Sequence, residues 1–313
     1  MTRLRSVLLI LFLVLPMSAN AAVASGDFPE DTMWYMHADL KEMRATDSGL
    51  ELSAWLDEEV FTEVKEETGI DLKEEVDRIT AFSNNLRGAV IVIEGDISTK
   101  TRDKVLAVAE IEGNLNMLTY GKTTYYHVDH QRSDDDDDDD DSNRHRHDMN
   151  SLEDSAYFTF DIKRRLIVTS DEDQLKALID SNGKIAGVGE QNGTIFVLTA
   201  EKDFVQAGMR TDGFGDEIDW DSNILRNIEQ AALLIADRDG MIAIEAKLVS
   251  SDPRMAESVA SIINGLLSLQ VFNTELDPEL ARILQNTKVE VEDAVLSIKT
   301  VIDPATIVDF VAD

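Results

Sequence analysis

The feature of this sequence that most restricts its fold is an order of hydrophobic patterns that occurs twice along the chain. Hydrophobic residues recur every two positions in some segments and every three to four positions in others, which is typical of strands and helices in one protein. The alternating residues Val90 and Val92 precede Ile242 and Ile244 by 152 positions, and in both places a helical pattern follows. We interpret the two halves as copies of one unit, and the alternative is a chance similarity of two α+β segments.

The predicted elements follow the same order in both halves. In the first half we expect strands at 33–40, 79–85, 88–94, 156–161 and 165–169, with helices at 50–69, 98–112 and 171–180. In the second half we expect strands at 194–199, 228–236, 240–248, 289–292 and 294–302, with helices at 253–269 and 304–311. This order predicts an α+β fold with two similar units, each an antiparallel sheet with helices packed on one face. The units are expected at 22–182 and 194–313, joined by a linker at 183–193.

Three helices of the second half are expected to begin at Asp-Pro pairs, which start at Asp252, Asp277 and Asp303. An aspartate before the first turn accepts hydrogen bonds from free backbone amides, and proline at the first helical position loses no hydrogen bond. We therefore interpret these aspartates as helix caps and not as catalytic groups.

The first 21 residues have the features of a secretory signal peptide. Arg3 and Arg5 precede an apolar run from Val7 to Leu15, and Ala19-Asn20-Ala21 matches the small-x-small pattern of a signal peptidase site. The apolar run is shorter than the about 20 residues that a transmembrane helix needs. We expect cleavage after Ala21, export to a bacterial periplasm or the extracellular medium, and no stable membrane anchor afterwards.

The chain is strongly acidic, with 62 acidic and 29 basic side chains and a formal charge of −33. Cleavage after Ala21 would remove Arg3 and Arg5 and change this charge to −35. Such a chain lacks the cationic surface that nonspecific nucleic-acid binding needs to displace counterions from phosphates, so we exclude nucleic acid as a partner. Cysteine is absent, which excludes disulfides, thiolate catalysis and Cys-ligated metals.

Residues 129–150 form an acidic and histidine-rich insertion in the first unit. It contains eight consecutive aspartates and then Arg144-His145-Arg146-His147, and its only apolar side chain is Met149. A segment of this composition cannot bury enough apolar surface to offset its conformational entropy. We therefore expect a disordered loop between the strands around Tyr125 and Phe158, and the simplest interpretation is a low-complexity expansion in an exposed loop.

The alternative interpretation of this insertion is a low-affinity site for calcium or another divalent cation. Carboxylates are ligands for hard cations, and imidazoles are ligands for transition metals. The negative charge nearby keeps imidazolium groups protonated to higher pH, which opposes transition-metal binding near neutrality. The predicted ligands are Asp134, Asp135, Asp136, Asp137, Asp138, Asp139, Asp140, Asp141, His130, His145 and His147.

The sequence lacks the motifs of the common enzyme classes. It contains no Gly-x-Ser-x-Gly elbow, phosphate-binding loop, dinucleotide-binding glycine pattern or His-Glu-x-x-His helix. His37 lies in a predicted strand and is interpreted as a structural histidine whose ring nitrogens have hydrogen-bond partners. We predict no catalytic residue and no cofactor, and a hydrolase with an unrecognised acidic site remains a remote alternative.

The predicted helix at 253–269 carries apolar residues at helical spacing. Packing of this stripe against the paired strands is the expected role, and binding of a partner helix or a lipid tail is the alternative. Its members are Met255, Val259, Ile262, Ile263, Leu266 and Leu269. Taken together, the sequence predicts an exported, non-enzymatic envelope protein, a binding or scaffold module whose partner is another envelope protein or a small ligand.

Overall fold

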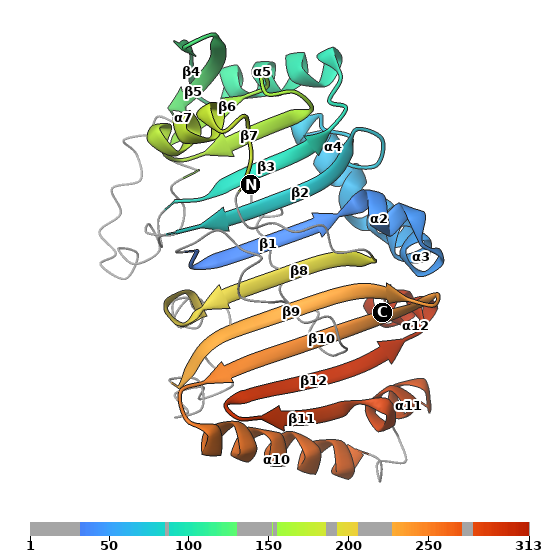
Figure 1. Cartoon of the computed structure of the whole chain (residues 1–313). Coiled ribbons are helices and arrows are strands. Elements are labelled where there is room, and N and C mark those ends of the chain that lie inside the picture. Colours follow the sequence, from blue (N-terminus) through green and yellow to red (C-terminus); the bar gives the residue numbers. More distant parts are fainter. Residues whose placement is uncertain are drawn as a thin grey trace, which may run out of the picture. The chain divides into compact units, whose positions relative to one another are not determined.

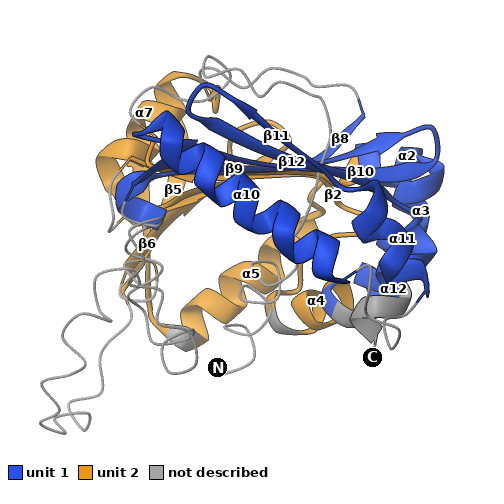
Figure 2. Cartoon of the chain, turned by 90° about the horizontal axis from the view of Figure 1, so that it is seen from below, with its two compact units in different colours: residues 1–23, 42–60, 191–313 blue, residues 24–41, 61–190 orange. Residues whose placement is uncertain are grey.

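The computed structural model describes residues 32–84, 88–129, 152, 155–185, 193–205, 227–270 and 278–312 (Figure 1). These residues form helices and antiparallel strands, and they divide into two compact units (Figure 2). The predicted α+β class with two similar units is confirmed.

Unit 1 is built mainly from the second half of the chain. Its described residues belong to 42–60 and 191–313. The strands are β8 (Thr194–Glu201), β9 (Ile228–Arg238), β10 (Met241–Ser250), β11 (Lys288–Glu292) and β12 (Val295–Ile302). The helices are α3 (Asp47–Leu56), α10 (Pro253–Gln270), α11 (Pro278–Asn286) and α12 (Pro304–Ala312).

Unit 2 contains the described residues of 24–41 and 61–190. Its strands are β1 (Trp34–Asp39), β2 (Val76–Ser83), β3 (Val90–Gly95), β4 (Asn114–Tyr120), β5 (Thr123–Asp129), β6 (Ser155–Thr159) and β7 (Arg165–Thr169). Its helices are α4 (Thr62–Thr68), α5 (Thr99–Glu112) and α7 (Glu172–Asp180). Two short helices have residues in both units: α2 (Leu40–Ala45) and the π-helix η1 (Asp57–Phe61).

The two units share one strand order, which supports their origin as copies. Unit 2 has the order β1-β2-β3-β7-β6, continued by β5 and β4, and unit 1 has the order β8-β9-β10-β12-β11. The register matches as well. Val90 and Val92 lie opposite Thr169 and Ile167, and Ile242 and Ile244 lie opposite Ile302 and Thr300. The residues that suggested the duplication therefore occupy equivalent places in the two sheets.

The units differ in how helices cover their strands. In unit 1, α10 packs on Leu296 and Ile298, and Figure 2 shows α10, α11 and α12 on one side of the strands. In unit 2, Leu175 of α7 packs with Ile167, whereas Arg102 of α5 lies 5.5 Å from the ring of Phe160. Because neighbouring residues of a strand point to opposite faces, α7 and α5 lie on opposite faces of the strands of unit 2.

Residues 42–60 belong to unit 1 although they precede most of unit 2. The sequence predicted units that are continuous in the chain, but tertiary hydrogen bonds tie this segment to distant residues. Glu42 Oε1 accepts a hydrogen bond from the Gly193 amide at 3.1 Å, and Ser48 donates to the Asp237 carboxylate. The helix predicted at 50–69 is also divided, because the π-helix η1 separates α3 from α4.

Local signals set the ends of several elements as predicted. Ser98 caps α5 by accepting a hydrogen bond from the Thr101 amide, and the β9–β10 hairpin turns at Asp239 and Gly240, which both have positive φ. Helices α10, α11 and α12 begin at the prolines of the three Asp-Pro pairs. Asp252 and Asp303 each accept a hydrogen bond from a first-turn amide at 3.0 Å, whereas Asp277 lies outside the described residues.

Candidate functional site

The residues predicted to bind a cation all lie outside the part of the chain that the structure describes. These are Asp134 to Asp141, His130, His145 and His147, so the cation site stays a prediction. Within the described residues no group of three or more His, Asp or Glu side chains is placed to hold a metal ion. The strongest candidate surface is found elsewhere, on helix α10.

The inner side of α10 explains how the helix is held on the strands of unit 1. Ala256 and Ala260 are buried and pack against Leu296 and Ile298 of β12. Their small side chains allow the helix to approach the sheet closely. Val259 and Ile263 are half-buried beside this contact.

The outer side of α10 exposes three large apolar side chains. Ile262, Leu266 and Leu269 are 52%, 56% and 68% exposed, and their spacing places them in one stripe along the helix. The sequence predicted that these residues pack in the core, which is wrong for all three. From Leu269 to Ala260, the apolar arc of α10 spans about 180° at 100° per residue, and the sheet covers only part of it.

The exposed part of α10 is also free of charge. Arg254 and Glu257 are the charged residues of this helix, and none of the 13 residues from Ser258 to Gln270 is charged. The equivalent helix of unit 2, α5, carries six charged residues among 14. The shared fold therefore does not require an uncharged helix at this place.

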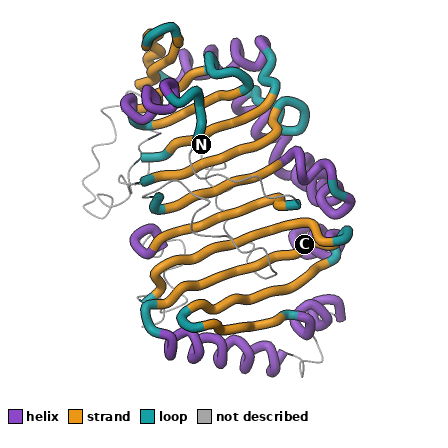
Figure 3. Tube along the Cα trace, viewed as in Figure 1, coloured by secondary structure: helices purple, strands orange, loops and turns teal. Residues whose placement is uncertain are grey.

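Three serine hydroxyls on the remaining surface of α10 are hydrogen-bonded within the helix, so they add little polarity to this surface. Ser258, Ser261 and Ser268 each donate a hydrogen bond to the backbone carbonyl four residues earlier, at 2.7–2.8 Å. Their hydroxyl protons are therefore already used within the helix. In Figure 3, which has the same view as Figure 1, α10 is the long helix that follows β10.

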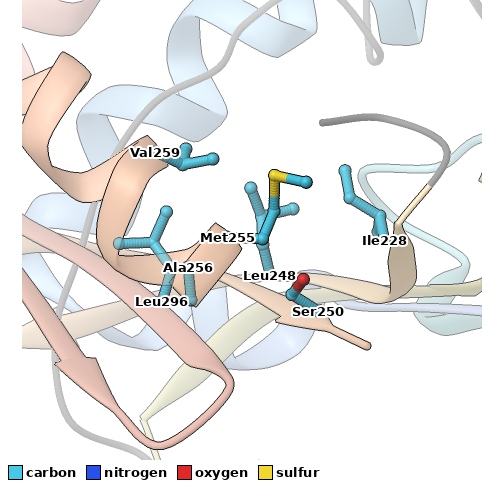
Figure 4. A pocket seen from close by; sticks show the side chains of 7 residues that line it. All are labelled: Ile228, Leu248, Ser250, Met255, Ala256, Val259 and Leu296. Carbon is cyan, nitrogen blue, oxygen red and sulfur yellow. The ribbon is translucent and has the colours of Figure 1, made fainter. Parts of the chain in front are cut away.

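A small cavity lies at the N-terminal end of the exposed stripe (Figure 4). Its volume is about 20 Å³, and its walls are Ile228, Leu248, Ser250, Met255, Ala256, Val259 and Leu296. Binding sites for small molecules usually have volumes of about 300–1,000 Å³. This cavity has room for little more than one water molecule and is much smaller than such sites.

A larger hollow of about 530 Å³ lies over the strands of unit 1, and its lining is mostly charged. The hollow is lined by Glu245, Lys247, Glu292, Asp293, Val295, Ser297 and Lys299. Glu245 is 3% exposed, and its Oε1 lies 3.4 Å from Lys247 Nζ and 3.7 Å from Lys299 Nζ. Lys299 also contacts Glu290 at 3.0 Å. Both lysines of this hollow are therefore paired with carboxylates, and its three carboxylates leave the lining with one excess negative charge.

His37, which was interpreted from the sequence as a structural histidine, contacts the neighbouring strand. Its Nδ1 lies 2.9 Å from Thr80 Oγ1, on the neighbouring strand. Burial lowers the pKa of His37 below its usual value, and the charge of Asp39 opposes this shift. Two positions further along these strands, four charged residues lie opposite one another on neighbouring strands: Asp39, Arg78, Glu94 and Arg165. Ion pairs at 2.7 Å join Arg78 to Asp39 and Arg165 to Glu94.

None of the helices in the described segments combines the length and the hydrophobicity that crossing a bilayer requires.

Comparison with known proteins gives structural similarity at low identity. No family model and no curated protein sequence matches the chain. Among solved structures, it is similar to three crystal forms of TP0453. Form III has a TM-score of 0.47 at 9% identity, covering 93% of this chain and 98% of that chain. Form IV has 0.48 at 8% identity, covering 91% and 96%, and form I has 0.43 at 7% identity, covering 94% and 97%. At these values the similarity carries no argument about function.

Proposed function

We propose that this protein is an exported, non-enzymatic binding module that holds a cationic, amphipathic segment of another polypeptide against helix α10. The observation that carries the proposal is the exposed stripe of Ile262, Leu266 and Leu269 on a helix segment without charged residues. Export is supported by the signal-peptide features of the first 21 residues.

The apolar stripe supports a helical partner because its residues lie at helical spacing. An amphipathic helix that docks on another helix or in a groove uses anchors at i, i+3 or i+4 and i+7. Ile262, Leu266 and Leu269 have this spacing on α10. A partner helix with the same spacing can pack its apolar residues beside them, and Gly265, around which an added Cβ would meet open space, leaves room for close approach.

The charge of the chain supports a cationic partner. With a formal charge of −33, the protein attracts cations over long distances and repels other acidic chains. The absence of charges on the exposed part of α10 prevents local ion pairs at the centre of the contact. A partner with apolar residues on one face and lysine or arginine on the other meets both conditions.

The test is a calorimetric titration of the mature protein with an 18-residue helical peptide made only of leucine and lysine. Its leucines form one stripe, and a second peptide has the same composition with leucines on all sides. We expect saturable binding of the first peptide and much weaker binding of the second. Replacing Ile262, Leu266 and Leu269 together by Gln should weaken binding at least tenfold, about 1.4 kcal/mol.

The matched control is Leu50→Gln, since Leu50 is 53% exposed on α3 of the same unit. This change should leave peptide binding unaltered. Equal binding of both peptides, or equal binding by the triple Gln variant, would contradict the proposal. A third outcome would also contradict the proposal. If the wild-type protein binds no peptide but associates with itself or with neutral lipid vesicles, and the triple Gln variant does neither, the surface has a different occupant.

A further inference from the structure

Strand β4 ends the strand order of unit 2 and leaves one backbone edge without a strand partner among the described residues. Its other edge pairs with β5, from Asn114 opposite Asp129 to Tyr120 opposite Thr123. Figure 1 shows β4 and β5 as the hairpin that follows α5. An open edge of this kind is a template for pairing with a further strand.

The edge of β4 lacks the charged residues that usually prevent such pairing. Its sequence is Asn-Leu-Asn-Met-Leu-Thr-Tyr, without a charged residue or proline. Strand β11, which ends the strand order of unit 1, has the sequence Lys-Val-Glu-Val-Glu, in which three of five residues are charged. Charged side chains on an edge strand disfavour pairing with other chains, so β11 is protected and β4 is not.

Exposed apolar side chains border this edge. Met117, at the middle of β4, is 72% exposed, and Ile111, near the end of α5, is 84% exposed. Met117 lies opposite Tyr126 in the β4–β5 register. Tyr126 stacks on Phe158, which belongs to the face of the strands covered by α5. Met117 and Ile111 therefore lie on the same side of the strands.

We propose that β4 pairs antiparallel with β4 of a second copy of this chain, with Met117 opposite Met117 on a two-fold axis. In this register Asn116 lies opposite Leu118 and Asn114 lies opposite Tyr120, so no two like charges meet along the strands. The two exposed methionines come into contact at the centre. This pairing involves no residue of α10 and is independent of the function proposed above.

Two copies are both acidic and repel each other at long range, but the charges next to β4 are complementary between two copies, which favours a second copy over an unrelated extended peptide. The two-fold arrangement brings Lys122, exposed in the β4–β5 turn, toward the last turn of α5 in the second copy, where Glu110 is exposed. The C-terminal end of a helix also attracts cations. Both contacts occur twice in the symmetric pair. Pairing through a single strand buries less area than the about 1,200–2,000 Å² of stable complexes, so the dimer should form in a concentration-dependent way.

The experiment is sedimentation velocity of the mature protein over a concentration series from about 5 to about 500 µM. We expect the wild-type chain to shift from monomer to dimer. Met117→Lys and Met117→Glu should each weaken dimerisation at least tenfold, because each places like charges opposite one another at the axis. An equimolar mixture of the two variants should restore the dimer through the Lys–Glu pair.

Controls separate this register from other contacts. Met117 is largely exposed in one copy, so both variants should keep the wild-type circular dichroism spectrum and melting temperature. Glu290→Lys, on the charged edge strand β11, should leave dimerisation unchanged. A wild-type chain that stays monomeric throughout, variants that dimerise like wild type, or a mixture that does not recover the dimer would each overturn the proposal.

Discussion

At the scale of single residues, charged groups on the strands of both units are paired with neighbours on adjacent strands. In unit 2 the row of Asp39, Arg78, Glu94 and Arg165 alternates in sign across four strands. In unit 1 the buried Glu245 lies between two lysines. Removing one partner of such a pair leaves a poorly solvated charge, which costs more than losing an exposed ion pair.

Lys299→Met tests this difference in unit 1. The change leaves Glu245 with one nearby lysine, and we expect the free energy of unfolding to fall by about 2 kcal/mol. Lys202→Met is the control, because the side chain of its partner Glu229 is 42% exposed and thus much better solvated than Glu245, and it should cost less than about 1 kcal/mol. Urea denaturation measures both values, and equal losses would show that the cluster around Glu245 does not stabilise the unit.

His37 gives a prediction for pH dependence. Burial lowers its pKa in the folded state, against the charges of Asp39 and Glu94 and together with that of Arg78. The unfolded chain therefore binds this proton more readily, so the stability that neutral His37 provides is present above about pH 6.5 and is lost as pH falls below it. The melting temperature of wild type minus that of His37→Gln should shrink between pH 8 and pH 5.5. A difference that is constant with pH would contradict this account.

At the scale of elements, the apolar residues of helix α10 divide into a group that packs on the sheet and a group that is exposed to solvent. Its sequence shows the width of the apolar arc but not how much of the arc the sheet covers. Ala256 and Ala260 are buried, while Ile262, Leu266 and Leu269 are exposed. Three of the larger apolar residues of the helix therefore lie on its solvent side, where packing within the unit does not require them, whereas Val259 and Ile263 are half-buried beside the sheet.

Two substitutions on α10 should differ in their effect on stability, because one residue is buried and the other is exposed. Ala260→Leu introduces a larger side chain against the sheet and should lower the free energy of unfolding by about 1–3 kcal/mol. Leu266→Gln changes an exposed position and should stay within about 0.5 kcal/mol of wild type. Denaturation curves of the two variants check this, and a large loss for Leu266→Gln would mean that the residue is needed for the fold.

Most strands were predictable from the sequence because their alternation is clear, as in Val90 and Val92 of β3. Strand β4 was missed for a physical reason. Four of its seven residues are exposed, and Asn114, Asn116 and Leu118 lie on the same face, so no alternation marks it. The Gly121-Lys122 turn before the β5 residues Thr123 and Thr124 was the available sequence signal for a hairpin of β4 and β5. The candidate surface on α10 was recognised as a stripe, but its exposure depends on tertiary packing.

At the scale of the whole molecule, the two units have the same strand order, in agreement with the repeated pattern of the sequence. The inclusion of residues 42–60 in unit 1 could not be predicted. The hydrogen bond from Ser48 to Asp237 joins positions 189 residues apart, and no local pattern indicates such a contact. The excess of 62 acidic over 29 basic side chains also acts at this scale, because like charges repel one another across the folded surface.

Salt should therefore stabilise this protein. At about 0.1 M salt the Debye length is about 10 Å, and more salt screens the remaining repulsion between carboxylates. Raising sodium chloride from 0.05 to 0.5 M at pH 7.5 should increase the melting temperature by a few degrees. The increase should be smaller near pH 4.5, where many carboxyl groups are protonated. An unchanged or lower melting temperature at pH 7.5 would contradict this expectation.

The most direct test of the central claim, that α10 is the contact surface for a cationic amphipathic segment, uses the absence of cysteine. Leu266→Cys introduces the only thiol of the chain, which can carry an environment-sensitive fluorophore. Adding the striped leucine–lysine peptide should shift its emission to the blue in a saturable way, while the same label at Leu50→Cys should not respond. No response at position 266, or the same response at both positions, would contradict the account.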